Sequence, residues 1–360
     1  MKKKLISLTI SLCLGLTLSL AAAEKPAKQE LVKPQSKEAL KKMEKADKAL
    51  QKNDVTGALA LYTEVIALEP NYAPVYYTTA QINRGQGNYD LALTNYEKAL
   101  ALTPDFALAQ TEYIRTLLAL SQKAVEGREQ KKAIDYYEKI MSVKNIETTY
   151  PKELQHAAYQ AGALAYSLQD FNKSIAAFQR FMAIPEIETK SPNNSALATY
   201  MLGINYSRLN QSDKAILCLE KYVTGPQNEI TKPWMPVSHY LLANNHYLIL
   251  EKKIAQIKED KSTDAMVTFE RIAEAAKANT AIQPNLVKAI ELKPDLEDAF
   301  LKLGNYYFYC MDFDNALKVY NDLISKFPTS ADLASYKSFQ QNIEKERDFI
   351  QSQKTKKKKK

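Results

Sequence analysis

The sequence predicts an all-α protein, a solenoid of helix-turn-helix repeats. Only 9 of its 360 residues are Gly, which leaves little material for tight hairpins or phosphate-binding loops. A period of 34 residues can be read directly, because Ala58 and Tyr62 recur as Ala92 and Tyr96. Small residues such as these alanines let one helix approach the next, and large residues such as these tyrosines fill the space between repeats.

The first residues are typical of a secretory signal. Lys2–Lys4 precede an apolar run from Leu5 to Leu20, and the small residues Ala21–Ala23 follow it. We therefore expect residues 1–23 to be a signal peptide that is cleaved before Glu24, which would make the protein periplasmic or secreted. An uncleaved anchor is the alternative, although the run barely reaches the length that a bilayer requires.

The next segment is expected to be a flexible linker, and the segment after it the repeat array. Residues 24–36 are rich in Lys, Glu, Pro and Gln and lack apolar periodicity. Helical periodicity then extends over residues 37–350. We expect the last part of it, residues 330–350, to form a helix that caps the exposed end of the array. Residues 351–360 hold six lysines, so they predict a disordered tail.

The individual repeats differ in clarity. The clearest copy has an aromatic residue, Leu-Gly and Tyr in its first helix, then Ala, an aromatic residue and Pro in its second. Its residues are Phe300, Leu303, Gly304, Tyr307, Ala316, Tyr320 and Pro328. A copy from Tyr76 to Pro104 is nearly as clear. Proline cannot continue a helix, so Pro70, Pro104, Pro294 and Pro328 should end the second helices.

The middle of the chain is less regular. We expect helix pairs at 107–120 with 133–141, at 152–184, around Gly203 and Ala215, and at 237–254 with 263–277. A further fragment between 279 and 294 looks like a second helix. Insertions are expected near 121–132, 185–195, 224–236 and 255–285. The only Trp, Trp234, lies in the third insertion, where it either pins the insertion onto the array or anchors a partner.

These motifs resemble the tetratricopeptide repeat family. Phe300 stands where the family usually has Trp, and Tyr320 stands where it usually has Phe. The resemblance covers about residues 37–350 and implies a right-handed superhelical solenoid of about six to seven repeats. It also implies that the first helices line a concave face, and that the array is a non-catalytic scaffold or adaptor for protein or peptide segments.

Charge does not indicate a nucleic-acid partner. The formal net charge is +8, but Lys2–Lys4, Lys354 and Lys356–Lys360 together carry nine positive charges. The rest of the chain is therefore at −1, and its totals give no sign of a basic footprint. The lysine tail leaves one alternative function open. In it, Lys356–Lys360 bind an anionic envelope surface and the array is a spacer.

The residues that carry most enzyme chemistry are sparse. The three histidines are His156, His239 and His246, and the last two are seven apart rather than at the one-turn spacing that zinc pairs favour. No P-loop, serine elbow or dinucleotide-binding glycine pattern occurs. Cys218 and Cys310 lie too far apart in a linear array for a disulfide. We expect no enzyme activity, cofactor, metal or small-molecule substrate; an enzyme with dispersed catalytic residues is the remote alternative.

A second stripe on the first helices is the candidate binding surface. Residues three before, one after and four after the small residue of a helix share one side, which in the family faces the concave groove. Here this stripe is rich in Tyr, which combines apolar area with a hydroxyl, and in Asn, Gln and Arg, which can hydrogen-bond a peptide. The expected groove residues are Tyr77, Gln81, Arg84, Arg115, Tyr159, Tyr166, Tyr200, Arg208, Tyr240, Asn244, Tyr247, Asn305 and Phe308.

Two considerations limit this expectation. The tyrosines could instead pack the first helices of adjacent repeats against each other. In addition, one subclass of the family clamps a terminal carboxylate with Lys and Asn on this stripe, and the lysine-type places are taken here by Met43, Tyr77 and Thr111. That departure argues against the same specificity.

Overall fold

The computed structural model describes residues 33–260 and 264–358. The expected signal peptide and all of the expected linker before residue 33 lie outside these described residues. The chain divides into two compact units, the first ending at Ile184 and the second beginning at Pro185. Each unit is considered by itself below.

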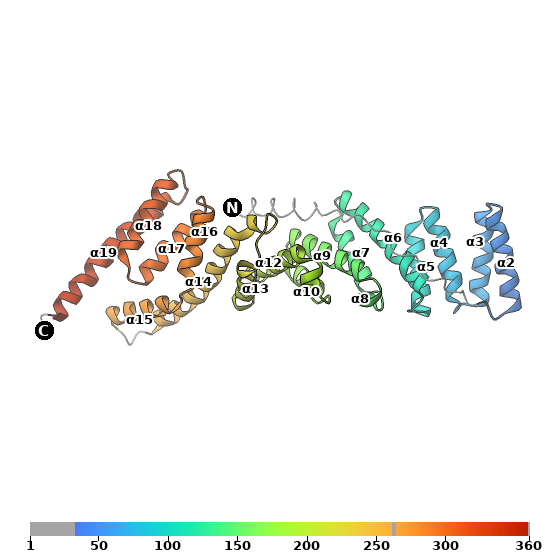
Figure 1. The fold of residues 1–360 in the computed structure, drawn as a ribbon, viewed down its shortest axis with the longest axis horizontal. Helices are drawn as coiled ribbons and strands as arrows, with labels where there is room; N and C mark the ends of the chain where they lie inside the picture. The colour runs from blue at the N-terminus through green and yellow to red at the C-terminus, as the bar shows by residue number, and fades with distance from the viewer. Residues whose placement is uncertain (1–32, 261–263, 359–360) are drawn as a thin grey trace. The chain divides into compact units, whose positions relative to one another are not determined.

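Unit 1 is a row of antiparallel helix pairs, as predicted (Figure 1). The pairs are α2 with α3, α4 with α5, α6 with α7, and α9 with α10. The bounds are α2 Lys37–Gln51, α3 Val55–Leu68, α4 Ala73–Gly85, α5 Tyr89–Leu102, α6 Ala107–Glu126, α7 Gln130–Met141, α8 Ile146–Thr149, α9 Pro151–Ser167 and α10 Phe171–Met182.

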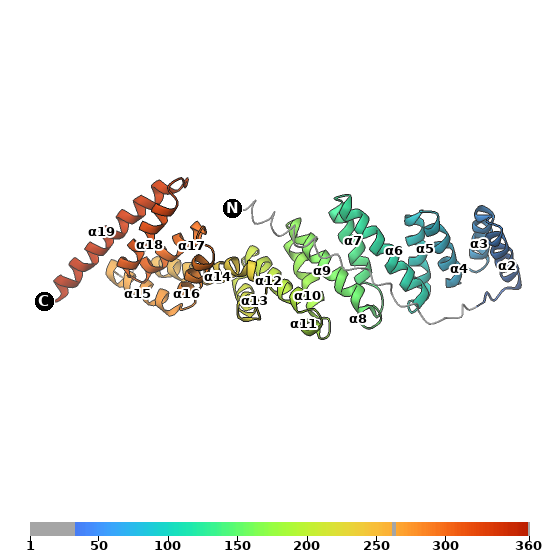
Figure 2. The ribbon, with the colours of Figure 1, turned by 45° about the horizontal axis from the view of Figure 1, so that its top comes forward.

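Unit 2 is also all-helical in its described residues (Figure 2). Here α12 pairs with α13, α14 with α16, and α17 with α18, and α19 packs on α18 at the end. The bounds are α11 Ile187–Lys190, α12 Pro192–Arg208, α13 Ser212–Thr224, a 3₁₀ turn at Lys232–Trp234, α14 Met235–Glu259, α15 Ala265–Ala278, α16 Ile282–Leu292, α17 Glu297–Tyr309, α18 Phe313–Lys326 and α19 Leu333–Lys358.

Close packing at the small residues confirms the repeat pattern. A Cβ atom built on Gly304 would lie 2.7 Å from Tyr320 Cε2, closer than real Cβ contacts, so only glycine fits between α17 and α18. Ala58 and Ala92 are completely buried in the equivalent second helices, and Tyr62 and Tyr96 are fully buried beside them.

The turns between repeats are closed by side chains as well as by proline. The Tyr76 hydroxyl donates a hydrogen bond of 2.9 Å to the carbonyl of Pro70, and Gln110 Nε2 donates one of 2.7 Å to the carbonyl of Pro104. Donor and acceptor lie six residues apart in both turns, and the second turn follows the first by 34 residues. The side chain thus satisfies a carbonyl in the turn that follows the helix.

The middle repeats follow a second period of 41 residues, which differs from the period of 34 residues that the sequence analysis identified. Ile146-Glu147-Thr148 recurs as Ile187-Glu188-Thr189, in the short helices α8 and α11. Each short helix is preceded by a residue with positive φ, Asn145 (57°) or Glu186 (58°). The first helix of this repeat is also longer than expected: α6 continues to Glu126, into the insertion expected near 121–132, and α7 follows from Gln130.

The expected pairing near residue 263 is wrong. We expected α14 to pair with the helix at 263–277, but its main partner is α16, and α15 is an additional helix that contacts α14 and α17. The fragment recognised between 279 and 294 is therefore the second helix of this repeat. Ala289 of α16 is completely buried, as a small residue at such a contact should be.

The final helix also differs from expectation. We expected a cap over 330–350 and a disordered tail from 351, but α19 runs from Leu333 to Lys358. Its buried residues Tyr336, Ile343 and Ile350 recur at intervals of seven, which places them on one side of the helix. In the described part of the chain, no helix has the length and apolar character that crossing a membrane requires.

Candidate functional site

Most aromatic residues of the expected groove are buried between helices. Five of the seven, Tyr77, Tyr159, Tyr166, Tyr200 and Tyr247, are at most 7% exposed, and Tyr240 and Phe308 are half-buried. Burial on this scale favours the packing alternative for these five side chains. The accessible part of the stripe is consequently polar rather than aromatic.

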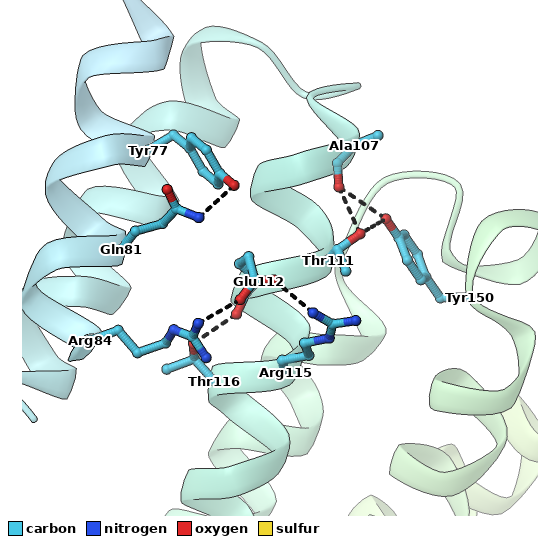
Figure 3. A network of polar contacts seen from close by, with 9 residues as sticks. All are labelled: Tyr77, Gln81, Arg84, Ala107, Thr111, Glu112, Arg115, Thr116 and Tyr150. Atoms are coloured by element: carbon cyan, nitrogen blue, oxygen red, sulfur yellow. Dashed lines mark hydrogen bonds and ion pairs between the residues drawn. The ribbon is translucent and has the colours of Figure 1, made fainter. Parts of the chain in front are cut away.

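Tyr77 illustrates this packing role. Its ring lies 5.1 Å from the Phe106 ring and 6.2 Å from the Tyr96 ring, so it joins α4 to α5 and to the turn before α6. Its hydroxyl accepts a hydrogen bond of 2.7 Å from Nε2 of Gln81, which is exposed (Figure 3). Burial is the main cause that raises the pKa of Tyr77, so the phenol stays neutral over the physiological range. Its role at the surface is thus to orient Gln81.

A charged cluster lies beside this pair, between the first helices of two successive repeats. Arg84 on α4 places Nη2 3.0 Å from Oε2 of Glu112 on α6, and Arg115, one turn after Glu112, places Nη1 2.8 Å from Oε1 (Figure 3). Two guanidinium groups therefore share one carboxylate. This set, with Gln81, is called the arginine cluster below.

The arginine cluster is positively charged and open to solvent. The Glu112 side chain is only 14% exposed, whereas those of Arg84 and Arg115 are 40% and 35% exposed. The carboxylate is thus covered by the two cations, and the accessible face carries an excess of one positive charge. Each guanidinium has five N–H donors, so the two groups together offer more donors than one carboxylate can accept.

Two of the places that the clamp subclass fills with lysine are closed by internal contacts. The hydroxyls of Thr111 and Tyr150 lie 2.8 Å apart, and Thr111 also donates to the carbonyl of Ala107 (Figure 3). The Tyr72 hydroxyl lies 3.7 Å from Sδ of Met43. Neither place presents a cation, so the arginine cluster is a different arrangement from that clamp.

The expected groove residues of unit 2 form no comparable cluster. The Tyr240 hydroxyl donates to Asp298 Oδ2 at 3.3 Å, and Asn305 Oδ1 accepts from the Tyr320 hydroxyl at 2.6 Å. Lys302 Nζ lies 4.7 Å from the centre of the Tyr247 ring. Of the remaining expected residues, Arg208 is exposed and Asn244 is half-buried.

The lone Trp and two of the histidines make structural contacts within the helices. Trp234 is 6% exposed, and its ring lies 5.5 Å from that of Tyr200, so it pins the irregular segment onto α12. His239 Nδ1 lies 2.6 Å from Oδ1 of Asn285, and burial lowers the pKa of His246. Within the described residues, no group of three or more His, Cys, Asp or Glu could hold a metal ion.

Two of the helix pairs match models of a known repeat family. Residues 73–106, which include α4 and α5, match the model of the tetratricopeptide repeat, and residues 298–330, which include α17 and α18, match a second model with the same description. These two segments match the tetratricopeptide repeat. The resemblance stated from the motifs is thus confirmed for the two clearest copies.

Solved structures with tetratricopeptide repeats are similar at low sequence identity. YrrB, described as a tetratricopeptide repeat protein with an unusual peptide-binding site, is 17% identical, with 67% of this chain and 96% of that chain covered and a TM-score of 0.33. A tetratricopeptide repeat protein from Parabacteroides merdae is 14% identical (85% and 100% covered, TM-score 0.29). The C-terminal part of another from Cytophaga hutchinsonii is 16% identical (82% and 98% covered, TM-score 0.36). No curated protein matches the chain in sequence.

One residue of the arginine cluster was missed by the sequence reasoning. Glu112 stands two places before the small-residue position of its repeat, outside the stripe of expected groove residues. Its spacing of three from Arg115 on one helix was the available signal, because residues three apart are neighbours on a helix surface. The contact with Arg84, 28 positions earlier, required the packing of α4 against α6.

Proposed function

We propose that the protein is a non-catalytic interaction scaffold and that the arginine cluster of unit 1 binds an acidic segment of a partner protein. Tetratricopeptide repeats generally serve protein interaction, which supports the first part. The observation that carries the second part is the exposed pair of guanidinium groups, held by a carboxylate that is itself largely covered.

The arrangement suits an acidic side chain for a physical reason. Arg84 and Arg115 are already held by Glu112, so their side chains would lose little entropy on contact with a partner carboxylate. The exposed Gln81 amide, oriented by Tyr77, adds a donor and an acceptor for a peptide backbone. Attraction between the cluster and an acidic segment would mainly increase the rate of association and its dependence on salt.

The experiment is an affinity purification of partners with the parent protein, followed by binding assays with three charge-removing variants. Arg84→Gln and Arg115→Gln should each weaken an identified acidic partner, whereas Lys98→Gln, on the exposed side of α5, should not. Salt should weaken the parent complex more than the Arg84→Gln complex. Equal binding by all four proteins would remove the arginine cluster from the proposal.

We also propose that the protein is exported. The support is the sequence of residues 1–23, with its lysines, apolar run and small residues. Mass spectrometry of the protein from its own cells should give a mature chain that begins at Glu24. A chain that retains Met1 as the main species would contradict export by cleavage.

A further inference from the structure

Unit 2 contains a hollow of about 350 Å³ that the scaffold function does not use. It exists because α15 is inserted between the two helices of a repeat and lies against α14 and α17. Figures 1 and 2 show α15 near α17 and α19 in both views. The hollow is lined by Lys258, Ala265, Thr268, Phe269, Ile272, Phe308, Tyr309 and Glu346.

The walls of the hollow are apolar and accessible. Ile272 forms a buried part of the wall, and Phe269, Phe308 and Tyr309 are half-buried, so parts of their rings face the open space. A volume in this range is at the small end of ligand pockets and is sufficient for one large side chain with a polar head group. Aromatic walls of this kind bind another apolar or aromatic group by contact area and ring stacking.

The lining of the hollow carries one charge of each sign. Lys258, near the end of α14, is exposed, and Glu346 on α19 is half-buried. Neither side chain forms an ion pair or a hydrogen bond within residues 33–260 and 264–358, although nearby Arg271 and Asp260 pair at 2.6 Å. The lining thus offers a cationic group and an anionic group beside apolar walls.

We infer that this hollow binds a free α-amino acid with a large apolar side chain. Its carboxylate would lie at the ammonium group of Lys258, its ammonium group at the carboxylate of Glu346, and its side chain among Phe269, Ile272 and Phe308. This site is separate from the arginine cluster, and it does not depend on a protein partner.

The direct test uses L-phenylalanine as the probe and saturation-transfer NMR with the full chain. Three analogues each remove one feature: 3-phenylpropionate lacks the ammonium group, 2-phenylethylamine lacks the carboxylate, and glycine lacks the side chain. L-Phenylalanine should bind, each single-charge analogue should bind about two- to fivefold more weakly, and glycine should give no signal. Equal binding of N-acetylphenylalanine amide, which has no charge, would overturn the zwitterion assignment.

Variants place the binding in the hollow. Ala265→Trp fills the space from an exposed position and should abolish the signal. Lys258→Gln should weaken L-phenylalanine but not 2-phenylethylamine, and Glu346→Gln should weaken L-phenylalanine but not 3-phenylpropionate. Lys252→Gln and Glu344→Gln, exposed on the same two helices outside the lining, are the matched controls. Circular dichroism melts check that each variant is folded.

Two further results would overturn the inference. One is an unchanged L-phenylalanine signal in Ala265→Trp, Lys258→Gln and Glu346→Gln, which would locate the binding elsewhere. The other is no signal from the folded parent protein at any accessible concentration of L-phenylalanine. Because Lys258→Gln and Glu346→Gln keep the apolar walls intact, they decide the question even if Ala265→Trp does not fold.

Discussion

Nη2 of Arg84 lies 3.0 Å from Oε2 of Glu112, although the two residues belong to the first helices of successive repeats. A helix in such an array touches mainly its neighbours, so this ion pair links two repeats as well as shaping the charged surface. The Glu112 carboxylate therefore contributes both to the contact between repeats and to the proposed binding surface. A single change at Glu112 should affect stability and partner binding in opposite directions.

Glu112→Gln is the change that separates these two effects. Removing the shared anion leaves two neighbouring, partly exposed arginines that repel each other. The free energy of unfolding should therefore fall by about 1 kcal/mol. Binding of an acidic partner should become tighter, since the cluster gains a net positive charge. Urea unfolding and a binding titration measure the two quantities. Glu126→Gln, exposed on the same helix, is the control and should change neither.

Gly304→Ala should be destabilising although alanine is the better helix former. The added Cβ would lie 2.7 Å from the Tyr320 ring, and overpacking of this kind costs about 1 to 3 kcal/mol. Gly85→Ala is the matched control, because a Cβ there would meet nothing within 4 Å. That variant should be neutral or more stable by up to about 1 kcal/mol. Thermal melts that rank the two variants the other way would show that α17 and α18 are not so closely packed.

Gln169→Gly should stabilise the turn between α9 and α10. Gln169 has a φ of 61°, a left-handed conformation that costs a non-glycine residue about 1 to 2 kcal/mol. Glycine removes that cost but has more freedom in the unfolded chain, so we expect a net gain of about 0.5 kcal/mol. Gln122→Gly, an exposed position inside α6, should instead lose about 1 kcal/mol. Chemical denaturation midpoints distinguish a gain from a loss.

Stability should fall at alkaline pH, partly through Tyr72. Burial, with the nearby carboxylates of Glu69 and Asp47, raises the pKa of Tyr72 to about 12 from an ordinary 10. A raised pKa means that the folded state holds the phenol proton to a higher pH than the unfolded state does. The contribution of Tyr72 to the free energy of unfolding is therefore complete below pH 10 and is lost as the pH rises toward 12.

The measurement for this prediction is the unfolding free energy as a function of pH. At pH 11 the loss from Tyr72 alone should reach about 1 kcal/mol, and Tyr72→Phe should reduce the total decline between pH 10 and 12 by about 2 kcal/mol. Tyr89→Phe, at an exposed tyrosine of α5, serves as the control. A Tyr72→Phe profile parallel to that of the parent would contradict the assignment.

The helix pairs could be predicted wherever a repeat keeps its small and large residues. Packing within a repeat depends on residues that are close in sequence, such as Gly304 with Tyr320 and Ala92 with Tyr96. The structure confirms that both pairs are closely packed or buried. The inserted helix α15 could not be placed in the same way. Its pattern is as amphipathic as that of a second helix, and only the three-dimensional competition between α15 and α16 for α14 decides which one pairs.

The surface was less predictable than the fold for a related reason. Helical spacing puts Tyr77 and Tyr200 on a given side of a helix, but it does not say how deeply the neighbouring repeat covers that side. Tyr200 is 1% exposed because Tyr222 and Trp234, from α13 and an irregular segment, lie against its ring. Sequence spacing therefore places residues on one side of a helix, and long-range contacts determine which of them reach the solvent.

The short helices α8 and α11 are each preceded by a residue with the same left-handed backbone conformation. Asn145 and Glu186 have nearly the same φ, and the carbonyl of each accepts a hydrogen bond of 2.9 Å from the amide four residues later. Asparagine tolerates this left-handed geometry better than glutamate. The turn at Glu186 should consequently open more often, so the amide of Lys190 should exchange its hydrogen with deuterated water faster than the amide of Thr149 does.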